Sequence, residues 1–138
     1  MRLFKNNLPP DCPETKYRTC EDDLVCYHIT KSFPPTDQDF KTQVQKNEKR
    51  AKKPPKQLCK ASGLSVLKDI SDVINIVDTF PENGSYILKG VIRYNIDGVV
   101  KQTPHETIRP SHHTWYPFAD VDESEVFNEL ERKHEKRD

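Results

Sequence analysis

Residues 85–103, with the sequence SYILKGVIRYNIDGVVKQT, carry the fold prediction. Branched and aromatic residues recur through the first ten positions and return over the last five, a pattern typical of two β-strands. Between them, Asp97 and Gly98 form the kind of turn signal that closes β-hairpins. Gly90 inside the first strand indicates a bulge or the close approach of another backbone segment. The stretch therefore predicts an antiparallel hairpin within a small sheet.

The segment before this stretch predicts a helix over residues 69–80. Its apolar side chains recur at helical spacing and share one face: Ile70, Val73, Ile74, Val77 and Phe80. Asp69 or Ser71 can cap the first turn, and Pro81 stops the helix. Together with the strands, this helix predicts an α+β fold, a small and mostly antiparallel sheet with one packed helix.

Farther towards the N-terminus, the sequence LVCYHI at residues 24–29 predicts another strand, and residues 17–19 predict a shorter one. Prolines break the pattern over residues 1–15, which we expect to form an irregular arm. We expect a single α+β domain over residues 16–119.

The C-terminal segment, residues 120–138, predicts a charged helix attached to this domain. Asp122 can cap it, acidic residues suit its start and basic residues suit its end. Val126, Phe127 and Leu130 give it a narrow apolar stripe. We expect this helix to pack weakly on the domain, or to bind a protein partner or a second copy of the chain.

Residues 41–57 form a basic segment within the domain, and its positive charges continue to Lys60. Eight lysine and arginine side chains lie between residues 41 and 60, against the single carboxylate of Glu48. Because the segment has little to bury, it predicts either a solvated helix or a mobile linker. Nucleic acid is a less favoured partner, because the chain has no net charge and few aromatic residues lie among the lysines.

The composition excludes several broad classes of protein. Only 33% of the 138 residues are apolar, 32% are charged and the formal net charge is zero. No apolar run approaches the roughly 20 residues of a membrane-spanning helix, and the charge balance is not that of a strongly basic nucleic-acid binder. The first seven residues lack the apolar stretch of a secretory signal, so we expect a cytoplasmic protein without membrane contact.

Four cysteines, Cys12, Cys20, Cys26 and Cys59, raise the questions of disulfides and of metal binding. Cytoplasmic thiols stay reduced, so we favour free thiols over disulfides. Cys12, Cys20, Cys26 and His28 have the chemistry of zinc ligands, but their spacing lacks the close pairs of structural zinc sites. We therefore expect neither a metal nor a cofactor, and small buried thiols explain the cysteines equally well.

Residues 104–119, PHETIRPSHHTWYPFA, predict a loop rich in proline and histidine. His112 and His113 can act as general acid or base near neutral pH. Trp115 and Tyr116 can stack on the ring of a substrate. The alternative is structural: the aromatic rings anchor the loop on the sheet, and the imidazoles bind backbone carbonyls.

A nucleotide-like substrate would involve further residues. Arg18 can bind a phosphate through two N–H groups, and Ser62 or Ser65 can orient a ribose. No complete phosphate-binding, zinc-protease or serine-hydrolase motif accompanies them. The candidate catalytic residues are therefore Arg18, His112 and His113, and the candidate substrate-binding residues are Ser62, Ser65, Trp115 and Tyr116.

Two short segments resemble a group of small bacterial proteins that have no assigned activity. They are ASGLSVL at residues 61–67 and SHHTWYP at residues 111–117. In that pattern the first segment precedes a short helix and a hairpin, and the second closes the sheet. The resemblance covers residues 17–118. It implies a bacterial cytoplasmic protein with one compact domain, and it brings no substrate, cofactor or catalytic residue.

Two functions are consistent with these features. The separated charge blocks, the modest core and the lack of a complete catalytic motif favour a small cytoplasmic protein-interaction module. The alternative is a small transferase or hydrolase that acts on a nucleotide-like substrate through the loop carrying His112 and His113. A cavity shared by Arg18, His113 and either Ser62 or Ser65 would favour the enzyme.

Overall fold

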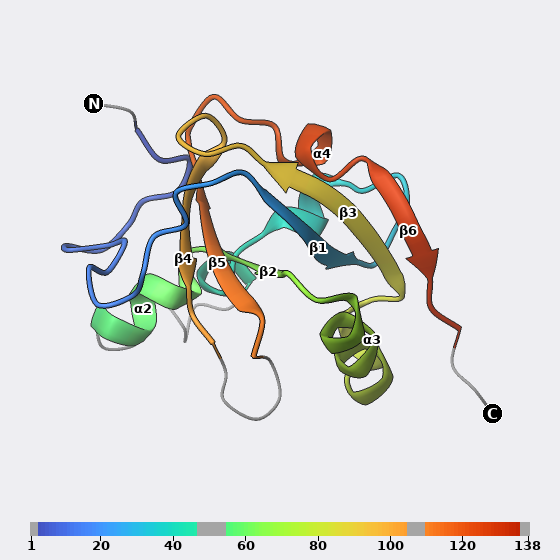
Figure 1. Cartoon of the computed structure of the whole chain (residues 1–138). Coiled ribbons are helices and arrows are strands. Elements are labelled where there is room, and N and C mark those ends of the chain that lie inside the picture. The colour runs from blue at the N-terminus through green and yellow to red at the C-terminus, as the bar shows by residue number, and fades with distance from the viewer. Residues whose placement is uncertain (1–2, 47–54, 105–109, 136–138) are drawn as a thin grey trace.

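The computed structural model describes residues 3–46, 55–104 and 110–135 (Figure 1). Over these residues the chain forms an antiparallel sheet with short helices, which confirms the α+β class. The strands are β1 (Leu24–Thr30), β2 (Leu64–Leu67), β3 (Tyr86–Ile92), β4 (Gly98–Gln102), β5 (His112–Pro117) and β6 (Glu129–Lys133). The helices are α1 (Gln43–Lys46), α2 (Pro55–Ala61), α3 (Ile70–Thr79) and α4 (Glu123–Val126), with 3-10 turns η1 (Asp37–Phe40) and η3 (Pro81–Asn83).

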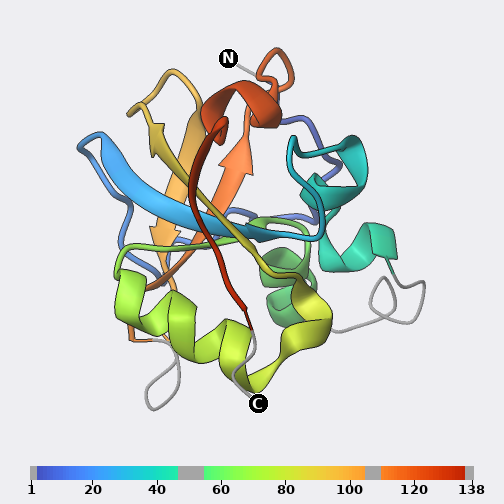
Figure 2. The same cartoon turned by 90° about the vertical axis from the view of Figure 1, so that its right-hand side faces the viewer.

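The strands lie in the order β4-β5-β2-β1-β3-β6, and every neighbouring pair is antiparallel. Among the described residues, β1 and β2 share a single register pair, Tyr27 with Leu67, so the sheet consists of two three-stranded halves joined narrowly. The halves cross at a large angle in Figure 2 and enclose a core that takes side chains from both. Trp115 of one half, and Leu88 and Ile92 of the other, are almost completely buried there.

Helix α3 confirms the helix that the apolar spacing predicts. The Asp69 carboxylate accepts a hydrogen bond from the Ser71 N–H at 3.0 Å and so caps the first turn. The buried face of the helix forms a second core with β2 and β3: Val73, Ile76 and Val77 pack with Leu67 and Ile87. Because successive strand residues point to opposite faces, this core lies on the other side of β3 from Leu88.

The predicted hairpin over residues 85–103 is wrong in its pairing, although both of its strands form. β3 pairs with β1 and β6, whereas β4 pairs with β5. The buried Asp97 carboxylate holds the connection, because it accepts the backbone N–H and the guanidinium of Arg93. The backbone carbonyl of Asp97 accepts a hydrogen bond from the indole N–H of Trp115. The turn therefore leads the chain from one half of the sheet to the other. The residues of the turn favour a reversal of the chain, but they do not determine which strand pairs with β4.

Gly90 confirms the predicted close approach of another backbone segment. A Cβ atom at this position would lie 2.4 Å from the carbonyl oxygen of Val126 and 2.8 Å from the Phe127 ring. The missing side chain thus lets the segment after α4 lie directly on β3.

The prediction of a loop over residues 104–119 is wrong for its second half, which forms β5 between β4 and β2. Thr114, Trp115 and Tyr116 favour a strand, and all three are buried. The neighbouring histidines and prolines hide this preference in the sequence. Residues 105–109, which include His105, lie outside the described part of the chain.

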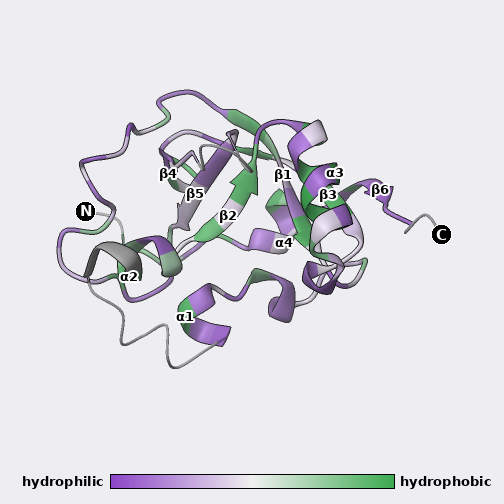
Figure 3. Ribbon diagram, turned by 90° about the horizontal axis from the view of Figure 1, so that it is seen from below, coloured by the Kyte–Doolittle hydropathy of each residue, from purple (hydrophilic) through white to green (hydrophobic). Residues whose placement is uncertain are grey.

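The prediction of a single helix over residues 120–138 is also wrong. Asp122 caps a helix, as expected, but α4 ends at Val126 and is followed by Phe127, whose side chain is fully buried. That ring lies 5.7 Å from the Trp115 ring and 5.6 Å from the His28 imidazole, centroid to centroid. Burial of Phe127 turns the chain back along β3, where β6 pairs as an exposed and hydrophilic edge strand (Figure 3).

The N-terminal arm is tied to the domain by a disulfide between Cys12 and Cys59, where the sequence favoured free thiols. Cys20 and Cys26 are free. In place of the expected strand at residues 17–19, the structure has an isolated bridge between Thr19 and Lys101 at the edge of β4. No helix within the described ranges is long and apolar enough to cross a membrane.

Candidate functional site

Ser65 and His112 are brought together by the pairing of β2 with β5. Ser65 lies opposite Thr114 in this register, and His112 lies opposite Leu67. The side chains of Ser65 and His112 project from the same face, and Ser65 Oγ lies 2.9 Å from His112 Nε2. A hydroxyl in hydrogen-bond contact with an imidazole is the arrangement of an activated nucleophile and its general base.

The surroundings of His112 define which ring nitrogen carries the proton. His112 Nδ1 lies 3.0 Å from the carbonyl oxygen of Thr103, an atom that can only accept a hydrogen bond. Nδ1 therefore donates to this carbonyl, and Nε2 is left as the acceptor for the Ser65 hydroxyl. The Thr103 hydroxyl lies 2.8 Å from both His112 Nδ1 and Thr114 Oγ1, so it holds the ring in this orientation.

A second histidine contacts the backbone of Ser65. His28 is buried, with Nδ1 3.0 Å from the Ser65 carbonyl oxygen and Nε2 2.8 Å from the Asp39 carbonyl oxygen. Its ring stacks on Phe40 at a centroid distance of 5.2 Å. Burial lowers the pKa of His28, which favours the neutral form, and the hydrogen bonds from the ring to the Asp39 and Ser65 carbonyls oppose this effect.

Ser65 and His112 line an open cavity of about 1410 Å³ between β2, β5 and the segment around η1. The cavity is rich in cationic side chains, which come from the loop after β1, from η1, from α1 and from α2: Lys31, Lys41, Lys46 and Lys60. Asp39 and Glu82 are the acidic residues of the same lining, so the described wall carries a formal excess of two positive charges.

Among the described residues, the lysines of this cavity have no carboxylate partner within ion-pair distance. The Lys60 ammonium lies over the Tyr17 ring. Burial, and next the like charge of Lys31, lower the pKa of Lys46. An anion bound between Lys31 and Lys46 would relieve this repulsion.

The Asp39 carboxylate is already used by its own turn. It accepts hydrogen bonds from the N–H groups of Lys31 and Thr36 and from the Ser32 hydroxyl, at 2.7–2.9 Å. Burial opposes ionisation of this carboxyl, but these three hydrogen bonds outweigh it and lower its pKa. Asp39 therefore fixes the shape of the cavity rim, while its negative charge also offsets part of the positive charge of Lys46.

Arg18 and His113 lie away from this cavity, so the cavity shared by Arg18, His113 and a serine, which would have favoured the enzyme predicted from the sequence, is not formed. The backbone carbonyl of Arg18 accepts from Gln102 N–H at the outer edge of β4, two strands from Ser65. His113 follows His112 in β5 and so points to the opposite face, where its Nδ1 lies 2.6 Å from the Ser111 carbonyl oxygen. The structure thus separates the two histidines that the sequence places side by side.

The remaining predicted residues have structural contacts. The hydroxyl of Ser62 is bonded to the Leu58 carbonyl at the end of α2. Trp115 is fully buried, and its indole N–H donates to the Asp97 carbonyl. The buried Tyr116 hydroxyl donates to the Cys59 carbonyl. Neither aromatic ring therefore presents a face to a ligand.

Sequence reasoning missed four contributors to the site: Thr103, His28 as a contact of Ser65, and the lysines Lys31 and Lys46. No local motif marks them, because strand pairing and the fold of the η1 segment bring them together. Of the four zinc-ligand candidates considered from the sequence, Cys12 is in the disulfide with Cys59. In the portion of the chain that is described, no three His, Cys, Asp or Glu side chains group closely enough to hold a metal.

The arrangement defines an α+β protein with a serine–histidine pair at a cationic cavity. The chain matches none of the protein-family models, curated proteins or solved structures with which it was compared.

The buried histidines predict a specific dependence of stability on pH. Burial lowers the pKa of both His28 and His113, so each binds protons less readily in the folded state than in the unfolded state. The free energy of unfolding should therefore be retained above pH ~6.5, the ordinary histidine value, and should fall as the pH drops below it. Urea unfolding at pH 7.5, 6.5 and 5.5 measures this.

The variant His113→Gln should show a shallower fall over the same range, because one of the two groups is gone. Aspartate titration contributes little at these three pH values, since an ordinary aspartate is half protonated only near pH ~4. Equal slopes for the variant and the unaltered protein would contradict the role of His113.

Proposed function

We propose that this protein is a small hydrolase or transferase in which Ser65 is the nucleophile and His112 the general base. The observation that carries the proposal is the 2.9 Å contact between Ser65 Oγ and His112 Nε2, in a tautomer set by the Thr103 carbonyl. Ser65 is exposed at the cavity, so a substrate can reach its hydroxyl.

The chemistry that this pair supports best is acyl transfer from an ester. Ser65 Oγ attacks the ester carbonyl carbon while its proton passes to His112 Nε2. The bond from the carbonyl carbon to the leaving oxygen then breaks, and His112 returns the proton to that oxygen. Water attacks the resulting acyl-serine through the same histidine in a hydrolase, and a second alcohol attacks it in a transferase. The Thr103 carbonyl stabilises the imidazolium that forms in each step.

The cavity favours a substrate that carries negative charge. Lys31, Lys41 and Lys46 line the wall near Ser65 and lack carboxylate partners among the described residues. A phosphate-bearing, nucleotide-like ester would place its anionic group against these lysines and its carbonyl at Ser65. Its recognition would rest on the anion, because Trp115 is buried and offers no ring for stacking.

A fluorophosphonate probe tests the nucleophile without knowledge of the substrate. The activated Ser65 hydroxyl should displace fluoride and form a phosphonate ester, which mass spectrometry locates on one peptide. Labelling should disappear in Ser65→Ala and fall strongly in His112→Gln at pH 7.5. Ser71, an exposed serine whose hydroxyl bonds to Asp69, is an internal control and should not react. No labelling of Ser65, or equal labelling of Ser71, would refute the proposal.

A further inference from the structure

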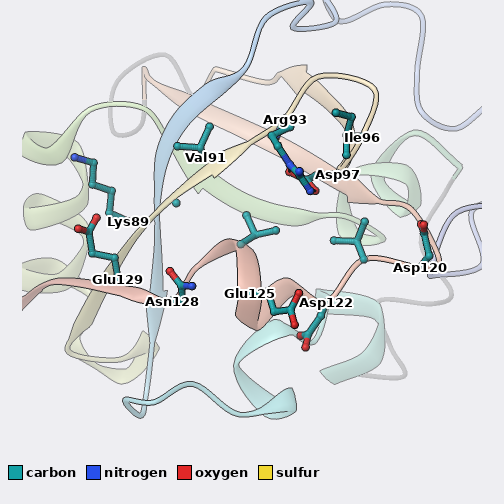
Figure 4. Close-up of a pocket in the computed structure, with 13 residues that line it drawn as sticks. Lys89, Val91, Arg93, Ile96, Asp97, Asp120, Asp122, Glu125, Asn128 and Glu129 are labelled. Atoms are coloured by element: carbon teal, nitrogen blue, oxygen red, sulfur yellow. Dashed lines mark hydrogen bonds and ion pairs between the residues drawn. The ribbon is translucent and has the colours of Figure 1, made fainter.

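A groove on another face of the molecule is separate from the Ser65 cavity and shares no lining residue with it. It lies between β3 with the turn that follows it and the segment that carries α4 (Figure 4). Val91, Arg93 and Ile96 lie on one side of it, and Asp122, Glu125 and Asn128 lie on the other (Figure 4). Its volume is about 650 Å³.

The first side of the groove exposes aliphatic surface. Val91 is 44% exposed and Ile96 is 48% exposed, whereas most apolar side chains of β3 are buried. The half-buried Val121 and Val126 extend this surface across the groove. Together these four side chains provide an apolar strip on which an aliphatic side chain of a ligand can pack.

The groove is also strongly acidic. Its lining holds five carboxylates and two cations, a formal excess of three negative charges: Asp97, Asp120, Asp122, Glu125 and Glu129 against Lys89 and Arg93. The cations already lie beside carboxylates, because Arg93 is bonded to Asp97 and Lys89 is opposite Glu129 in the β3–β6 register. The excess negative charge of the lining therefore falls on the side formed by the α4 segment, where Lys5, outside the lining, pairs with Glu123 and acts on Asp122.

The carboxylates of the groove are spread along it. Hydrogen bonding by the Ser124 hydroxyl lowers the pKa of Asp122, so this group stays ionised near neutral pH. In the parts of the chain that the structure describes, the acidic side chains do not converge as metal ligands would. An elongated ligand with several separated positive charges matches this pattern better than a single ion.

We propose that this groove binds an extended peptide segment of another protein, in which lysine or arginine alternates with aliphatic residues. The aliphatic side chains pack on Val91 and Ile96, and the cationic ones lie against Glu125 and Asp122. In an extended segment successive side chains point to opposite sides, which matches an apolar side facing an acidic one. The acidic side disfavours nucleic acid and anionic lipid at this face.

The inference changes the role that the sequence suggests for the C-terminal segment. As a helix, residues 120–138 would insert into the groove of a partner. In the structure residues 120–129 instead form one wall of a groove, and on this proposal the partner supplies the inserted segment. The proposal is independent of the chemistry at Ser65.

Fluorescence anisotropy with a labelled hexapeptide of alternating lysine and leucine tests the proposal. The unaltered protein should bind it, and binding should weaken several-fold between 50 and 300 mM salt because the contact is partly ionic. Glu125→Lys should weaken binding at least ten-fold, and the isosteric Glu125→Gln should weaken it about three-fold. Circular dichroism of each variant checks that the fold is retained.

Matched controls separate the groove from general surface effects. Val91→Ser should weaken binding about five-fold. Val25→Ser should not, although Val25 is 47% exposed, is the register partner of Val91 and lies outside the groove. Glu131→Lys, on exposed β6, controls for the change in net charge. A peptide of alternating glutamate and leucine should not bind.

The proposal is overturned if each groove variant behaves like its control, or if the acidic peptide binds as well as the basic one. Sedimentation of the protein alone provides a further test. Self-association that Glu125→Lys abolishes would assign the groove to a second copy of the chain and would also overturn the proposal.

Discussion

Replacing Ser65 with alanine should lower kcat/KM for mono-4-nitrophenyl succinate by about a thousand-fold or more, because the attacking oxygen is lost. The probe has an ester carbonyl for Ser65 and a carboxylate for the lysines of the cavity. His112→Gln should cause a comparable loss, since the hydroxyl then has no base. Release of 4-nitrophenolate at pH 7.5 measures both.

The two residues should behave as one unit. The double variant should be no slower than either single variant, because each change alone already disables the step. His113→Gln is the matched control, as it changes the neighbouring histidine on the opposite face of β5. Neutral 4-nitrophenyl acetate should be a poorer substrate than the succinate ester. If Ser65→Ala retained full activity, the proposed nucleophile would be wrong.

Removing the Cys12–Cys59 disulfide should lower the free energy of unfolding by about 4 kcal/mol at 25 °C. The bond closes a loop of 47 residues, and its loss returns that loop's conformational entropy to the unfolded chain. Stabilities of single domains are about 5–15 kcal/mol, so the reduced protein should be marginal near 37 °C. Urea unfolding with and without dithiothreitol measures the difference.

Thiol titration checks the pairing itself. The unfolded, unreduced protein should show the two thiols of Cys20 and Cys26, and reduction should expose all four. The variant Cys12→Ser should match the reduced protein in stability, whereas Cys20→Ser should stay close to the unaltered one. Four reactive thiols before reduction, or no effect of reductant on unfolding, would contradict the disulfide.

Local sequence signals were sufficient where an element depends on its own residues. The apolar spacing and the cap of α3 lie within twelve residues, and both are observed. The strand preference of β3 and the close approach at Gly90 were equally readable. Each of these features requires only a periodicity, a capping group or the absence of a side chain.

Local sequence signals failed where contacts between distant residues determine the strand pairing or the end of a helix. The turn at Asp97 leads β4 to the other half of the sheet because Asp97 is hydrogen-bonded to Arg93 and Trp115. Trp115 lies 18 residues after Asp97, so this contact is not visible in the local sequence. Phe127 ends α4 because the core offers it an aromatic site. The charge pattern of the residues after Phe127 is compatible with an exposed strand as well as with a helix, so the sequence alone could not distinguish the two.

The candidate site shows the same division. Ser65 and His112 were both among the predicted residues, but their contact spans 47 positions and arises from the pairing of β2 with β5. Periodicity correctly separates His112 from His113 only once their segment is known to be a strand. The roles predicted for Trp115 and Tyr116 depended on exposed rings, and burial removes that exposure.

The imidazole of His28 connects two segments that are distant in the sequence. One side of the ring touches the main chain at Ser65, and the other side touches the main chain at Asp39, in the turn at the mouth of the cavity. A molecule that displaced that turn would strain both contacts of the ring. On the proposed function, a ligand bound at the entrance should therefore change the reactivity of Ser65, and replacing His28 should weaken that effect.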